Sequence, residues 1–101
     1  MVSKKLTIIW DIEAAKDFKS AYLFIKKESV QSAIKVRREI INAIKKLAAH
    51  PESHPPDKFK FSNNGHYRAF EIYSYRIAYK FSEQEIIVLR FRHVKREPLE
   101  Y

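Results

Sequence analysis

The sequence of 101 residues contains no cysteine and only one glycine, and it lacks any long apolar run. Without cysteine, neither a disulfide bond nor a thiolate metal site can form. One glycine is too few for the glycine-rich loops that hold phosphate groups. The longest early apolar run, LTIIW at 6–10, is too short for the core of a signal peptide or for a membrane span. We therefore expect a cytoplasmic protein that stays out of the membrane and uses no cofactor and no metal.

Positive charge is the strongest feature of the composition. Twenty lysines and arginines stand against twelve aspartates and glutamates, which gives a formal net charge of +8. In so small a chain, this charge indicates a polyanionic partner, either a nucleic acid or an acidic protein. A charge that only keeps the protein soluble is the alternative. Apolar residues make up 46% of the chain, which is enough for one core, so we expect a single domain over 1–101.

The first half of the chain has the signals of one strand and two helices. The β-branched and aromatic side chains at 5–10 predict a strand. The spacing of apolar residues predicts helices at 14–27 and 30–49. Asp11 and Ser29 stand before these helices and are suited to cap them. Because the break between the helices is short, we expect a helical hairpin.

The second half of the chain has the signals of a sheet. After a proline-rich loop at 50–58 the apolar period changes from that of a helix to that of a strand. Asn64-Gly65 predicts a type I′ hairpin turn. The order β-α-α-β-β-β-β indicates an α+β fold, with the helical hairpin packed on one face of a small antiparallel sheet. The four strands of this half are expected at 58–61, 66–73, 75–81 and 85–91.

Alternation along the strands predicts an apolar face toward the helices and a cationic open face. In the last strand, Ile87, Leu89 and Phe91 share the side that we expect to meet the helices, which leaves Ile86 and Val88 on the open side. The cations of the open face would follow the phosphate backbone of a nucleic acid. Open sheet faces also have lysines and arginines that serve only solubility, which is the alternative. The predicted open-face cations are Lys58, Lys60, Arg76, Lys80, Arg90 and Arg92.

Three segments share a pattern with a known group of proteins. The second helix ends with L-x-x-x-P from Leu47 to Pro51, YRAFEIYSYRIAYKF follows at 67–81, and IIVLRFRHVKREPLEY closes the chain at 86–101. Together they resemble the RelE/ParE superfamily of toxins from type II toxin-antitoxin systems, to which plasmid stabilisation proteins belong. The resemblance covers nearly the whole chain. It implies a basic toxin that a cognate antitoxin binds and neutralises.

The superfamily has two branches with different activities. One consists of ribosome-dependent mRNA endonucleases, and the other of DNA gyrase inhibitors that are not nucleases. The basic open face and Arg76 in the motif Y-R-I-x-Y favour the nuclease branch, with the ribosome and mRNA as partners. The alternatives are a gyrase inhibitor, with DNA gyrase as its partner, and a basic nucleic-acid-binding module without toxicity.

The nuclease branch implies a set of catalytic residues. A 2′-hydroxyl attacks the adjacent phosphorus without a metal, so the site needs a proton acceptor, a proton donor and cations. The resemblance implies Arg76 as a cation at the phosphate, and Arg96 and Tyr101 as the basic residue and the tyrosine after the last strand. Pro98 in that interval departs from the family pattern. His93 is the other acid–base candidate, although alternation places it on the helix side, where a structural role is the alternative.

Further binding residues complete the expected surfaces. Lys95 is added to the nucleic-acid-binding set. Glu71 is better explained as a cross-strand partner of a cation than as a catalytic base. Val30, Ile34 and Ile41 lie beside the main apolar stripe of the second helix. They are predicted either to belong to a helix buried on two sides or to bind the antitoxin.

Overall fold

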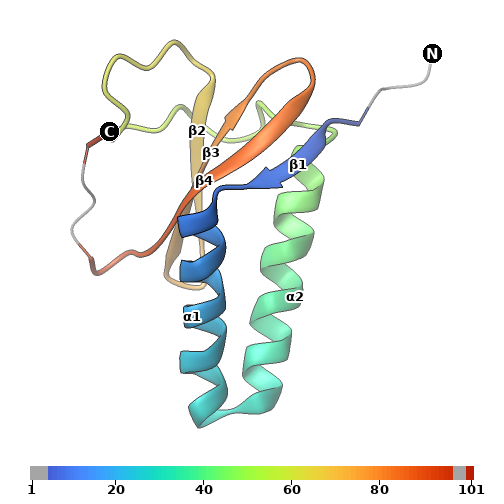
Figure 1. The fold of residues 1–101 in the computed structure, drawn as a ribbon, viewed down its shortest axis with the longest axis vertical. Helices are drawn as coiled ribbons and strands as arrows, with labels where there is room; N and C mark the ends of the chain where they lie inside the picture. The colour runs from blue at the N-terminus through green and yellow to red at the C-terminus, as the bar shows by residue number, and fades with distance from the viewer. Residues whose placement is uncertain (1–4, 97–99) are drawn as a thin grey trace.

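The computed structural model describes residues 5–96 and 100–101. Two helices pack against one face of a four-stranded sheet (Figure 1). The opposite face, called the open face below, is contacted by the loop that follows the helices and by no helix in the described residues. No helix in the described ranges is both long and apolar enough to cross a membrane. The arrangement confirms the predicted α+β fold with a helical hairpin on one face of a sheet.

The two helices form where the apolar spacing predicts them. Helix α1 spans Ile12–Glu28 and helix α2 spans Val30–Leu47. Asp11 caps α1 and Ser29 caps α2, and each side chain accepts a hydrogen bond from a backbone amide in the first turn of its helix. Because Ser29 alone separates the helices, the chain reverses there into the hairpin seen in Figure 1.

The sheet has the order β1-β4-β3-β2. β1 is parallel to β4, whereas the other pairs are antiparallel, so the sheet is mixed and not purely antiparallel as predicted. The helical hairpin returns the chain to the beginning of β1, where the Leu6 amide donates a hydrogen bond to the Ala48 carbonyl at 3.1 Å. The strands are β1 (Thr7–Trp10), β2 (Tyr67–Ile72), β3 (Tyr75–Phe81) and β4 (Glu85–His93).

A β-bulge in β4 changes which side chains face the helices. Ala78 pairs with Arg90 but Tyr79 pairs with Val88, so Leu89 is the extra residue that has no partner in the ladder. The alternation reverses at this residue. Ile86 and Val88 are therefore fully buried in the core, together with the correctly predicted residue after the bulge, Phe91. The prediction that placed Ile87 and Leu89 toward the helices was wrong.

The segment 58–61, predicted as a strand, forms turns instead. The edge of β2 is covered just before this segment, by one antiparallel bridge between Pro56 and Arg68. Proline has no amide to donate, so the bridge does not extend into a strand. Gly65 has a φ of 94° but Asn64 has no positive φ, so the predicted type I′ turn does not form there.

Tyr79 ties the sheet to the loop after α2, and its loss should be measurable. Its side chain is fully buried, and its hydroxyl donates a hydrogen bond to the Pro51 carbonyl at 2.6 Å. Burial raises the pKa of Tyr79 to about 12. We expect Tyr79→Phe to lower the free energy of unfolding by about 1–2 kcal/mol, because the hydrogen bond to the Pro51 carbonyl is lost. Urea denaturation measures this change, and Tyr22→Phe on the half-buried flank of α1 should change stability much less.

Candidate functional site on the open sheet face

Asp57 is a buried charge at the centre of the open face. Its side chain is 1% exposed. It accepts hydrogen bonds from Arg76 Nη2 at 2.8 Å, from the Tyr101 hydroxyl at 2.6 Å and from the Phe59 amide at 3.1 Å. Arg76 Nη1 bonds Glu71 on β2 at 3.0 Å, which confirms Glu71 as a cross-strand partner. The Arg76 guanidinium is thus held between two carboxylates that compensate its charge.

Asp57 and Tyr101 have pKa values that differ from those of an ordinary aspartate and tyrosine. Burial alone would raise the pKa of Asp57, but the hydrogen bonds from Arg76 and Tyr101 outweigh burial and lower it below its ordinary value. Burial and the hydrogen bond to Asp57 raise the pKa of Tyr101 well above that of an ordinary tyrosine. At neutral pH the aspartate is therefore ionised and the tyrosine is protonated.

Tyr101 docks on the turn that follows Asp57. Its amide donates to the Phe59 carbonyl at 3.0 Å, and its carbonyl accepts from the Phe61 amide and from Lys60 Nζ. Figure 1 shows this end of the chain beside the loop after α2. The turn at 59–61 and Tyr101, which are far apart in the sequence, therefore meet over the open face.

The predicted open-face cations surround this contact. Lys60 and Lys80 lie over the ring of Tyr67, with Nζ to ring-centroid distances of 4.7 and 5.5 Å. The guanidinium of Arg90 lies 4.6 Å from the ring centroid of Tyr101. The remaining cations are Lys58 and Arg76, which lie over the Phe59 ring, and Arg92, which pairs with Arg76 across the ladder.

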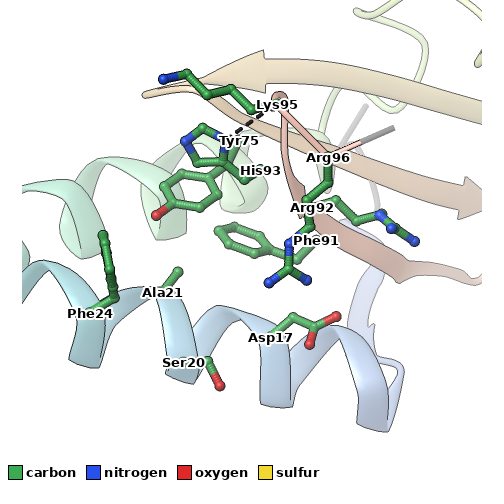
Figure 2. A pocket seen from close by; sticks show the side chains of 10 residues that line it. All are labelled: Asp17, Ser20, Ala21, Phe24, Tyr75, Phe91, Arg92, His93, Lys95 and Arg96. Carbon is green, nitrogen blue, oxygen red and sulfur yellow. Dashed lines mark hydrogen bonds between the residues drawn. The ribbon is translucent and has the colours of Figure 1, made fainter. Parts of the chain in front are cut away.

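A pocket of about 430 Å³ lies on the other side of the sheet, between α1 and the end of β4. Phe91, Arg92 and His93 at the end of β4 are among the residues that line it (Figure 2), so Arg92 borders this pocket as well as pairing with Arg76 on β3. His93 Nδ1 accepts a hydrogen bond from the Lys95 amide at 3.1 Å, and its ring meets the Tyr75 ring edge-on. Lys95, which is predicted to bind nucleic acid, also lines this pocket.

The four residues expected to act in catalysis are divided between the two sides of the sheet. Arg76 and Tyr101 meet through Asp57 on the open face. His93 and Arg96 line the pocket beside α1. The structure therefore brings these residues together as two pairs and not as one set of four.

Two of the three predicted antitoxin-binding residues are exposed. Val30 is 52% exposed and Ile34 is 50% exposed, whereas Ile41 is half-buried. The alternative that placed them in a second buried face is therefore wrong for Val30 and Ile34. Phe24 of α1, which is 66% exposed, adds to the apolar surface of the hairpin.

Acidic and histidine side chains do not gather into a metal site in the ranges 5–96 and 100–101. His54, in the loop after α2, stacks on the Phe70 ring at a centroid distance of 4.5 Å. Burial lowers the pKa of His54. This histidine therefore serves the packing of the loop as a neutral ring.

Asp57 is the site residue that sequence reasoning missed. It follows two prolines in a loop, and nothing in its neighbourhood distinguishes it from a solvated aspartate. The available signal was indirect, because an arginine such as Arg76 in the interior of a strand requires a counter-charge when it is covered.

Comparisons with known proteins agree with this fold. A family model described as the ParE toxin of the type II toxin-antitoxin system parDE matches residues 8–98. No curated protein matches the chain. A solved structure described as the chromosomal ParDE TA system from P. aeruginosa is 19% identical, covers 92% of this chain and 100% of its own, and has a TM-score of 0.69. At this identity the likeness shows the fold. The family match spans nearly the whole chain, and the chain therefore belongs to the ParE toxins of type II toxin-antitoxin systems.

Proposed function

We propose that this ParE toxin inhibits DNA gyrase and does not cleave mRNA. A ParDE system pairs the toxin with an antitoxin, so an antitoxin is its partner. Membership in the ParE family supports the gyrase-inhibiting branch over the nuclease branch that the sequence favours. The single observation that supports the proposal most is the state of Arg76, whose guanidinium is already bound by two carboxylates.

Metal-free RNA cleavage needs groups that this site holds in other contacts. Arg76 would have to leave Asp57 and Glu71 to stabilise a phosphate. Tyr101 is a poor general acid or base because its hydroxyl donates to Asp57 and its pKa is raised. His93 lies on the far side of the sheet. These contacts favour an inhibitor that works by binding. With gyrase as its target, the toxin would act in the cytoplasm.

Tyr101→Phe separates the two activities because it removes only a hydroxyl. We expect the purified toxin to stop supercoiling by gyrase, and Tyr101→Phe to do so with similar potency, since binding needs no proton transfer. Gel assays of supercoiling measure this, and primer extension on mRNA from induced cells should show intact transcripts for both proteins. Cleavage at discrete mRNA positions that disappears in Tyr101→Phe, with supercoiling unaffected, would return the toxin to the nuclease branch.

A further inference from the structure

We infer that the open sheet face binds the phosphate backbone of DNA directly, so that the toxin contacts the DNA as well as gyrase. The inference rests on the proposed function for the choice of DNA over RNA. The binding itself follows from the charges of the face and can be measured without gyrase.

The open face has a surplus of positive charge. Six cations and two carboxylates give it a formal net charge of +4. Both carboxylates are bound to Arg76, whose single charge they more than compensate, so the surplus of +4 comes from the other five cations of the face. The five are Lys58, Lys60, Lys80, Arg90 and Arg92.

Lys60 and Arg90 are held in place before any ligand binds. Lys60 bonds the carbonyls of Phe61 and Tyr101, and the Arg90 guanidinium lies over the Tyr101 ring. Side chains that are already ordered lose less entropy when they bind.

The arrangement suits a polymer of closely spaced charges. Arg90 and Arg92 are two residues apart on β4, which corresponds to about 6.8 Å along the strand. Duplex DNA has one negative charge per roughly 1.7 Å of its axis, so neighbouring cations can meet separate phosphates and release counterions. A folded acidic protein presents charge far less densely, and we therefore assign the face to a nucleic acid.

Glu71 provides a test by gain of binding. Its side chain is 55% exposed and bonds Arg76, whereas Asp57 holds the same guanidinium from the buried side. Glu71→Gln removes one negative charge from the face and leaves the contact of Arg76 with Asp57. We expect DNA affinity at low salt to rise by about fivefold, because repulsion of a phosphate by this carboxylate is lost.

The experiment is a titration of a fluorescent DNA duplex with the purified toxin at several salt concentrations. Five phosphate contacts predict a slope of about −4.5 for log affinity against log salt. Lys80→Gln should make the slope shallower by about 1, and Glu71→Gln should strengthen binding. Lys35→Gln on the exposed side of α2 removes the same charge from the helical layer and should change neither slope nor affinity.

Three outcomes would overturn the inference. They are equal losses in Lys80→Gln and Lys35→Gln, no gain in Glu71→Gln, or poly-glutamate competing as well as DNA. An RNA strand of equal length that binds much more tightly than DNA would instead assign the face to RNA. If gyrase is inhibited but free DNA is not bound, this inference fails and the proposed function stands. If DNA is bound but gyrase is unaffected, the proposed function fails.

Discussion

Replacing Asp57 by alanine is expected to lower the free energy of unfolding by about 3–5 kcal/mol. The loss is large because Arg76, whose side chain is only 18% exposed, would keep its charge without its buried partner. The Tyr101 hydroxyl and the Phe59 amide would also lose their acceptor. Urea denaturation followed by circular dichroism measures this change.

Glu71→Ala is the matched control, since it removes the other carboxylate from the same arginine. Glu71 is 55% exposed, so we expect a loss below about 1 kcal/mol. Equal losses for Asp57→Ala and Glu71→Ala would show that burial of Asp57 is not what makes this contact important.

Acid should remove the advantage of the wild-type protein over Asp57→Ala. The pKa of Asp57 is lowered in the folded state, so its contribution to stability is fully present above the ordinary aspartate pKa of about 3.9. This contribution is lost as the pH falls from there through the folded pKa. We therefore expect the two proteins to differ by a constant amount from about pH 5 to pH 7 and to converge below about pH 4. A difference that stays constant down to pH 2 would contradict the ionised state of Asp57.

Local rules predicted the helices but not the faces of the last strand. Asp11 and Ser29 cap α1 and α2 because capping depends only on neighbouring residues. The faces of β4 depend on a bulge at Leu89, which arises from pairing with a strand elsewhere in the sequence. Alternation alone therefore placed Ile86 and Val88 on the wrong side.

Turn residues gave a misleading signal for the same reason. Asn64-Gly65 has the composition of a type I′ turn, yet the two consecutive positive φ values occur at Tyr73 and Ser74, at 51° and 66°. The pairing of β2 with β3 sets this conformation in the absence of glycine. Tertiary contacts outweigh the preferences of the turn residues here.

The candidate site was predicted in its cations but not in its assembly. Arg90 and Arg92 both come after the bulge and pair with Ala78 and Arg76 on β3. Their side chains therefore share one face of the sheet with Arg76, as alternation predicts. Tyr101 reaches this face only through its contacts with Asp57 and the turn at 59–61, which depend on the fold of a loop. A residue so far away in the sequence has no local pattern that reveals its partner.

The exposed apolar side chains of α2 should decide how tightly the antitoxin binds. Val30 and Ile34 are each about half exposed and lie one turn apart on α2, and we predict that they contact the antitoxin. We expect Ile34→Glu to weaken the complex by about 2–4 kcal/mol, or roughly thirtyfold to thousandfold. The carboxylate would have to lose its water in the interface without gaining a partner.

Isothermal titration of the purified toxin with its antitoxin measures this loss, and a growth assay follows the consequence in cells. Ile34→Glu should keep its stability and inhibit growth even when the antitoxin is co-expressed, because position 34 contributes little to the core. Gln31→Glu introduces the same charge at an exposed position of α2 and should be neutralised like the wild type. If Gln31→Glu weakens the complex as much as Ile34→Glu, then general repulsion by the added charge explains both results, and the antitoxin does not use this apolar surface.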